Sequence, residues 1–324
     1  MRPSYLELYN SGALERVAEK AFGLLESCVI CPRRCKVNRL KEELGFCKIG
    51  LLARVYSYMP HHGEEPPISG TKGSGTIFFS GCNMACAYCQ NYEFSQLGEG
   101  RQVQADELAR QMLELQQLGC HNINLVTPTH VMPQILKALN IAASLGLKIP
   151  LVYNTSGYEL AGMLKLLRGI VDIYLTDMRY ADNEISIKYS NAPDYPKYNQ
   201  ESTKEMQRQV GVAQFDDNGT ILRGLVIRHL VLPDNASGTE RIMKFIAEEI
   251  SGESYISLMS QYTPYYRAHE FKELSRRLSY QEYVEAKSLM HKYSLYNGWT
   301  QDSGGLERFA GVYIKRNIKE KDEP

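Results

Sequence analysis

Short apolar runs alternate with amphipathic segments along most of the chain. The apolar runs predict strands at residues 75–80, 122–126, 149–153, 171–176, 223–233 and 255–259. The segments between them place apolar side chains at helical spacing and predict helices at residues 104–118, 131–145, 158–168, 199–213 and 238–250. Strands that alternate with helices form parallel sheets with right-handed crossovers, and binding sites then lie at the carboxyl ends of the strands. We therefore predict an α/β fold in which six strands form a partial barrel.

The segments on either side of this alternation have a different character. Residues 4–26 carry one apolar stripe and predict a packing helix, and residues 280–292 predict a helix near the C-terminus. Prolines and glycines in residues 58–70 predict a shaped loop. This loop contains His61-His62-Gly63-Glu64-Glu65, but adjacent side chains rarely point at one ion, and its role stays open. We expect a cysteine-rich N-terminal segment, a core barrel and a helical extension, at residues 1–70, 71–262 and 263–324.

Composition narrows the classes of function. Of the 324 residues, 44% are hydrophobic, which is enough for a sizeable core. Lys and Arg number 37, as do Asp and Glu, so the net charge is zero and gives no electrostatic case for a nucleic-acid partner. No run of 18 apolar residues and no secretory apolar core occurs, so we expect a cytoplasmic protein without a membrane span.

Seven of the eight cysteines fall into two tight sets. In a reducing cytosol such sets indicate metal binding and not disulfides. The eighth, Cys120, is isolated, and we expect it to be a small buried apolar residue.

The second of these sets has the more specific spacing. Cys82, Cys86 and Cys89 follow a C-x3-C-x2-C pattern directly after the predicted strand at 75–80. Three thiolates on one tight loop can hold three corners of a four-iron, four-sulfur (4Fe-4S) cluster and leave the fourth iron open to bind another molecule. Structural zinc sites use four ligands, and this stretch supplies neither a fourth ligand nor a nearby histidine. We predict a 4Fe-4S cluster on this segment, which we call the three-cysteine loop.

The first set, called here the four-cysteine set, comprises Cys28, Cys31, Cys35 and Cys47. Four thiolates could close a zinc tetrahedron or hold a second, fully ligated iron-sulfur cluster, and the spacing does not separate these choices. A third alternative is that the set holds no metal or a labile one. Arg33 and Arg34 would favour the thiolate form by their charge, although arginines on a loop are more often simply solvated.

The sequence around these cysteines resembles a known family. The three-cysteine loop and its surroundings (GCNMACAYCQN, NLVTPTH, DIYLTDMRY, NAPDYP and IRHLVLP) are similar to radical S-adenosylmethionine (SAM) enzymes, and more narrowly to the branch that resembles pyruvate formate-lyase activating enzymes. The resemblance implies a partial (β/α)6 TIM-type barrel that binds a 4Fe-4S cluster and SAM. It also implies a ferredoxin or flavodoxin as electron donor and reductive cleavage of SAM to a deoxyadenosyl radical. By analogy, that radical would take a hydrogen atom from a glycine of a partner enzyme.

The resemblance also assigns residues to the cofactor, although none is assigned a catalytic role. Where the family often has Gly-Gly-Glu after the second strand, this chain has Thr127-Pro128-Thr129-His130, so no contact is assigned there. The residues that the resemblance places at SAM are Tyr88 on the adenine side, Asn154 and Ser156 after the third strand, Asp177 with Arg179 in place of an Asp-x-Lys motif, and His229. Two of these assignments have structural alternatives. Asp177 and Arg179 could form an ordinary ion pair at a strand end, and a lone histidine on an apolar strand is more often a core residue.

Other functions stay open at this point. A radical SAM enzyme could modify a different protein or a small molecule, because a fold does not determine a substrate. An iron-sulfur sensor or scaffold would bind clusters at both cysteine sets without cleaving SAM. A zinc-binding interaction module is disfavoured by the neutral charge and by the three-cysteine loop. The sequence determines neither the substrate nor the oligomeric state.

Overall fold

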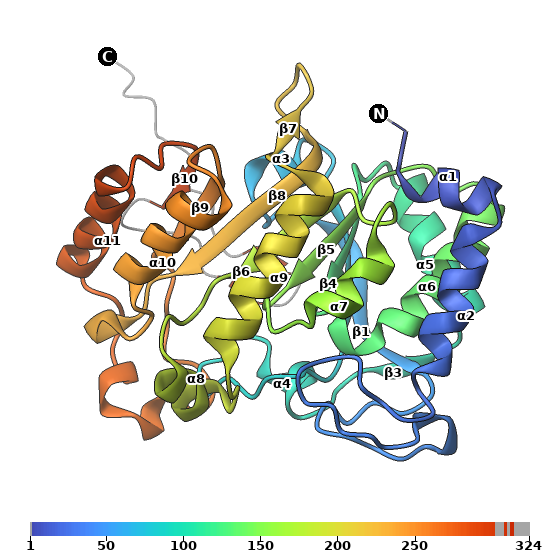
Figure 1. Cartoon of the computed structure of the whole chain (residues 1–324), viewed down its shortest axis with the longest axis horizontal. Helices are drawn as coiled ribbons and strands as arrows, with labels where there is room; N and C mark the ends of the chain where they lie inside the picture. The colour runs from blue at the N-terminus through green and yellow to red at the C-terminus, as the bar shows by residue number, and fades with distance from the viewer. Residues whose placement is uncertain (1, 302–307, 310–311, 314–324) are drawn as a thin grey trace.

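A mixed sheet forms the centre of the molecule (Figure 1). The computed structural model describes residues 2–301, 308–309 and 312–313. The strands of the sheet are β1 (Ala53–His61), β2 (Ser74–Phe79), β3 (Arg101–Val103), β4 (Ile123–Val126), β5 (Leu151–Thr155), β6 (Ile173–Asp177), β7 (Gln214–Phe215), β8 (Ile221–Leu230), β9 (Tyr255–Met259) and β10 (Gly298–Thr300). Two further strands, β11 (Arg308–Phe309) and β12 (Val312–Tyr313), pair with each other.

The order of strands in this sheet is β10-β9-β8-β6-β5-β4-β2-β1-β3, with β7 paired to β8 outside this path. Neighbours from β2 to β10 run parallel, whereas β1 runs antiparallel to both β2 and β3. The six strands predicted from the apolar runs are therefore all present and parallel. Different strands occupy the two edges, so the sheet is a partial barrel that does not close. This confirms the predicted fold class.

Helices connect the strands and cover the sheet (Figure 1). They are α1 (Tyr5–Asn10), α2 (Ala13–Gly23), α3 (Pro66–Ser69), α4 (Tyr92–Ser95), α5 (Ala105–Gln117), α6 (Met132–Ser144), α7 (Ala161–Leu164), α8 (Asn183–Ser190), α9 (Tyr195–Val210), α10 (Thr239–Phe245) and α11 (Tyr280–Lys292). The long amphipathic helices α5 and α6 lie within a residue of the predicted bounds, because each buries one continuous apolar face. Within the described residues, no helix is long and apolar enough to cross a membrane.

Three local predictions differ from the structure. The helix expected over residues 4–26 is broken into α1 and α2, because Gly12 between them has a φ of 69°. The helix expected at 158–168 is reduced to α7 and a short 3₁₀ turn at Lys165–Leu167. The prediction of a loop throughout 58–70 was wrong, because β1 continues to His61. Its proline, Pro60, lies beyond the part of β1 that pairs with β3, and proline is tolerated at such an edge.

The N-terminal segment packs into the same core as the barrel. Tyr5, Leu14 and Leu25 are fully buried in one cluster with Ile77 and Leu125 of the central strands. The hydroxyl of Tyr5 also donates to the carbonyl of Ile149 at 3.1 Å. The division into three parts stays a prediction, and its first boundary, at residue 70, follows a strand that belongs to the central sheet.

Candidate functional site

The three-cysteine loop begins directly after β2. Gly81 makes the turn out of the strand with a φ of 78°, which glycine adopts at low cost. Two backbone hydrogen bonds hold the loop against the end of α8, from Ala85 N to Ser190 O at 2.9 Å and from Ala87 N to Tyr189 O at 2.7 Å. The loop is therefore fixed on one side by the sheet and on the other by a segment about 100 residues later in the chain.

Hydrogen-bond donors surround the three sulfur atoms. Cys86 Sγ accepts from Arg179 Nη1 at 3.2 Å and from Ser190 Oγ at 3.0 Å. The Met84 amide donates to Cys82 Sγ at 3.3 Å, and the Ser95 hydroxyl lies 3.2 Å from Cys89 Sγ. Donors of this kind stabilise thiolates and tune the reduction potential of a cluster.

All three cysteines are free thiols, and their environment suits a metal cluster. Burial raises the pKa of Cys82 to about 12 and that of Cys89 to about 11, and a bound metal centre would offset this cost of the thiolate form. Within the described part of the chain, no three His, Cys, Asp or Glu side chains converge closely enough to hold a single ion. The three free thiols on one short loop supply the ligands for three corners of a 4Fe-4S cluster.

A cavity of about 180 Å³ adjoins the loop at the carboxyl ends of the strands. Its wall includes four of the predicted cofactor residues, Tyr88, Asn154, Asp177 and Arg179, together with Cys89. The positions come from the loop and from strands β5 and β6, which are neighbours in the sheet. The structure therefore brings these residues together beside the three-cysteine loop, as expected for a parallel sheet.

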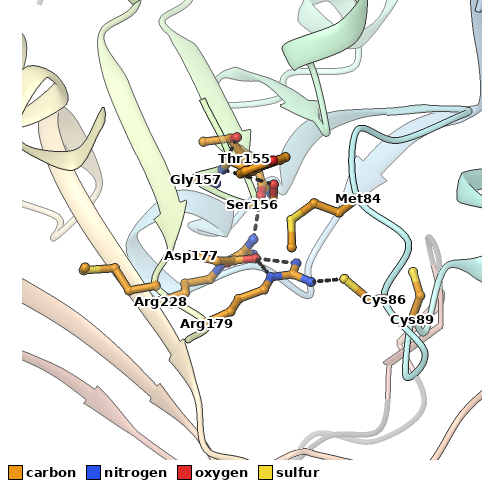
Figure 2. A network of polar contacts seen from close by, with 12 residues as sticks. Met84, Cys86, Cys89, Thr155, Ser156, Gly157, Asp177, Arg179 and Arg228 are labelled. Atoms are coloured by element: carbon orange, nitrogen blue, oxygen red, sulfur yellow. Dashed lines mark hydrogen bonds and ion pairs between the residues drawn. The ribbon is translucent and has the colours of Figure 1, made fainter. Parts of the chain in front are cut away.

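Charged side chains connect the cavity to the loop (Figure 2). The Asp177 carboxylate accepts from Arg179 Nη2 at 2.6 Å through one oxygen and from Arg228 Nε at 2.8 Å through the other. Arg179 in turn reaches Cys86, so the carboxylate, a guanidinium and a cluster-loop thiol form one chain of contacts. Burial alone would raise the pKa of Asp177, but the two arginines outweigh this and hold it below its usual range.

Two residues of this network were not among those assigned to the cofactor from the sequence, although the resemblance suggested a role beside the active site for the loop that contains Glu64. Arg228 donates to Asn154 Oδ1 at 2.6 Å and lies 3.4 Å from Glu64 Oε2, and both Arg228 and Glu64 line the cavity. Glu64 belongs to the histidine- and glutamate-containing loop whose role the sequence left open, and His61 of that loop also lines the cavity. Successive residues of a strand point to opposite faces, and this alternation could have directed attention to Arg228 in place of its neighbour.

That neighbour, His229, lies outside the cavity wall. It is fully buried, with Nδ1 at 2.7 Å from the Met178 carbonyl and Nε2 at 3.0 Å from Thr239 Oγ1. Both ring nitrogens are engaged by the protein, so the structure gives His229 the contacts of a core histidine. The assignment of His229 to the cofactor stays a prediction from the resemblance, and these contacts do not support it.

Ser156 and Tyr88 also have contacts within the protein. The Ser156 carbonyl accepts from the Tyr195 hydroxyl at 2.8 Å, and Ser156 is not part of the cavity wall. Tyr88 lines the cavity, and its hydroxyl is 2.6 Å from that of Tyr180. The Tyr88 ring packs edge-on against Tyr262 with centroids 5.6 Å apart, which fixes the position of the ring.

The four-cysteine set forms a second concentration of thiols. All four cysteines line one small pocket beside Asn83 of the three-cysteine loop. Cys28, Cys31 and Cys47 are buried, and none of the four forms a disulfide. Burial, reinforced by the neighbouring thiols, raises the pKa of Cys31 to about 12.

Comparison with known proteins identifies the family. Residues 76–246, more than half of the chain, match the profile of the radical SAM superfamily. The chain belongs to the radical SAM superfamily. Members of this radical SAM family bind a 4Fe-4S cluster and SAM, which agrees with the free thiols of the three-cysteine loop.

Relatives of this radical SAM protein give little further detail. An uncharacterized protein of Methanocaldococcus jannaschii is 32% identical over 302 residues, covering 90% of this chain and 82% of its own. The structure of a radical SAM methyltransferase from Sphaerobacter thermophilus is similar to this one with a TM-score of 0.47 at 14% sequence identity. The match covers 71% of this chain and 67% of the methyltransferase chain. A methylornithine synthase has a TM-score of 0.43 at 13% identity, over 98% of this chain and 87% of its own. We draw no functional conclusion from these two structures.

Proposed function

We propose that this radical SAM protein is an activase-like enzyme that cleaves SAM reductively and abstracts a hydrogen atom from a substrate. The observation that carries the proposal is the contact chain from Cys86 through Arg179 to Asp177, which joins the three-cysteine loop to a charged cavity. When bound, the cluster supplies one electron that breaks a sulfur-carbon bond of SAM and releases methionine and a deoxyadenosyl radical.

The residues of the cavity wall match the polar groups of SAM. Arg179 and Arg228 would attract its carboxylate, and Asp177 and Glu64 its amino group, because opposite charges pair when water is excluded. The side-chain amide of Asn154 would accept or donate hydrogen bonds at the sugar hydroxyls of SAM. The fixed ring of Tyr88 would border the adenine of SAM. Ser156 would act through the backbone, by keeping the segment after β5 in place.

The substrate is proposed by analogy alone. A glycine in a partner enzyme would lose a hydrogen atom from its α-carbon to the deoxyadenosyl group, leaving a glycyl radical and deoxyadenosine. Another protein or a small molecule is the alternative. An electron donor of the ferredoxin or flavodoxin type would reduce the cluster, and the free thiols suit a reducing, cytoplasmic setting.

Formation of deoxyadenosine tests the proposed reaction. The full chain is reconstituted anaerobically, reduced with dithionite and mixed with SAM, beside the variants Cys86→Ala and Cys120→Ala. We expect deoxyadenosine from the wild type and from Cys120→Ala, because Cys120 is a buried cysteine outside both sets, and about a 100-fold loss or more in Cys86→Ala.

A fully clustered wild type that forms no deoxyadenosine would contradict this function. It would favour the sensor or scaffold alternative, which needs no SAM cleavage.

A further inference from the structure

The pocket of the four-cysteine set has buried polar atoms without partners. Arg39 and His130 are each only 1% exposed and line this pocket. Arg39 Nη2 and His130 Nδ1 have no hydrogen-bond partner among the described residues. A buried polar atom without a partner destabilises the folded protein, because it has lost its hydrogen bonds to water. His130 Nε2 donates to the Ser80 carbonyl, which leaves its Nδ1 as an acceptor, whereas Arg39 Nη2 is a donor. A buried donor without a partner at a thiol-lined pocket indicates that an acceptor fills the pocket in the working protein.

Donors at the pocket are arranged toward sulfur. Arg39 Nη1 approaches Cys28 Sγ at 3.8 Å and donates to the His130 carbonyl at 2.8 Å. The amide of Phe46 donates to Cys35 Sγ at 3.5 Å, and a Cβ at Gly45 would lie only 2.9 Å from that sulfur. A buried cation and a backbone amide beside thiolates are the environment that stabilises an anionic metal centre.

Four thiols at one pocket can close on a single zinc ion or hold a larger iron-sulfur cluster. A zinc ion draws its four sulfurs to about 2.3 Å from a single point. The buried guanidinium of Arg39, with one nitrogen unpartnered, and the amide of Phe46 beside Cys35 favour a larger anionic core with sulfide acceptors. We propose that Cys28, Cys31, Cys35 and Cys47 hold a second, fully ligated iron-sulfur cluster, with Arg39 as its buried donor and counter-charge.

The second centre lies directly against the three-cysteine loop. Arg33, between two of the four cysteines in sequence, donates from Nε to the Asn83 carbonyl at 2.9 Å. A Cβ on Gly81 would overlap the Cys47 carbonyl oxygen, so the two backbones are in contact. His130 adds a third connection, with Nε2 at 2.8 Å from the Ser80 carbonyl. Filling the four-cysteine pocket therefore also fixes the loop that holds the first cluster.

Metal content tests this proposal without reference to SAM cleavage. The full chain is reconstituted anaerobically, and iron, sulfide and zinc are counted in the wild type and in the variant Cys82→Ala/Cys86→Ala/Cys89→Ala. We expect about eight irons per wild-type chain and about four in the triple variant for a four-iron second cluster, or about six and about two for a two-iron one, with zinc well below one. The matched variant Cys31→Ala/Cys47→Ala loses the second cluster, and Cys120→Ala keeps both.

If the triple variant holds one zinc per chain, or no metal at all, the proposal of a second cluster is contradicted. If a variant fails to fold, electron paramagnetic resonance of the reduced wild-type protein tests for the second cluster. Two signals of the reduced protein are expected, of which SAM changes only the one from the open cluster. A single signal that accounts for all the iron would contradict the proposal, whether or not SAM is cleaved.

The role of Arg39 has a separate test. The variant Arg39→Met removes the buried charge at similar volume, and Arg39→Lys keeps the charge. We expect a lower reduction potential of the SAM-insensitive cluster in Arg39→Met, because the electron enters a more negative site, and a potential near the wild type in Arg39→Lys. Equal potentials in all three proteins would show that Arg39 is not the counter-charge.

Discussion

Whether a strand residue contributes its side chain to the cavity depends on which face of the strand it occupies. Arg228 and His229 are adjacent in β8, and only Arg228 reaches Asp177 and Asn154. His229 points into the core, where the Met178 carbonyl and Thr239 engage both of its ring nitrogens. The resemblance therefore pointed to the right stretch of β8. The alternation of side chains along the strand decided that Arg228, and not His229, contributes to the cavity.

Glu159 is a buried acid that the proposed reaction does not use. Its carboxylate accepts from Thr129 Oγ1 at 2.5 Å and Thr155 Oγ1 at 2.6 Å, which ties the segments after β4 and β5 together. Burial raises its pKa to about 7 from an ordinary value of 4.5, although hydrogen bonds from Thr129, Thr155 and Tyr153 oppose the shift. The folded protein thus binds this proton more tightly than the unfolded chain does.

This shift predicts a pH-dependent stability. The contribution of Glu159 to the free energy of unfolding, taken as wild type minus Glu159→Gln, should fall by about 3 kcal/mol as pH rises from about 4.5 to about 7, and then level off. Glu159→Gln cannot ionise and should lack that decline. Denaturant unfolding of both proteins at several pH values measures the difference, with exposed Glu201→Gln as the control that keeps the wild-type slope. Parallel slopes for Glu159→Gln and the wild type would contradict the prediction.

At the scale of elements, the turn from β2 into the three-cysteine loop is the most constrained junction. Gly81 combines a φ of 78° with backbone contact to the four-cysteine set. The loop itself is recognisable from its cysteine spacing, because adjacent ligands must share one short segment. The contacts of the loop with the end of α8 and with Cys47 cannot be recognised from the sequence, because the residues in contact are far apart along the chain.

Gly81→Ala tests this junction against a matched glycine. Gly219 has a φ of 75° but no atom within 4 Å of an added Cβ, so Gly219→Ala measures backbone strain alone, at about 1–2 kcal/mol. Gly81→Ala adds a clash with the Cys47 carbonyl oxygen, and we expect a larger loss of stability and about half the bound iron or less. Unfolding curves and iron content give the result. Equal losses in the two variants would mean that the contact is unimportant.

At the scale of the whole molecule, the N-terminal segment and the barrel share one hydrophobic core. Leu14 of α2 is fully buried in the cluster that contains the central strands. A segment packed in this way should unfold together with the sheet, because neither part buries that surface alone.

Leu14→Ala should therefore destabilise the whole protein by about 3 kcal/mol, through lost burial and a cavity. Thermal or denaturant unfolding, followed by both circular dichroism and tyrosine fluorescence, should show one transition shifted as a unit. Leu145→Ala, at a position 61% exposed, is the control and should change stability by about 0.5 kcal/mol or less. A shift confined to a minor early transition would show that the segment folds independently.

The sequence by itself determined the alternating α/β pattern, the six parallel strands and the two cysteine sets. Each of these depends on local periodicity or on spacing within a short segment, which a chain displays before it folds. Tertiary structure decided that β1 joins the sheet, that Arg228 and Glu64 enter the cavity, and that the two cysteine sets adjoin. Those features need residues that are distant in sequence to meet, and the packing of the sheet, which no local pattern encodes, brings them together.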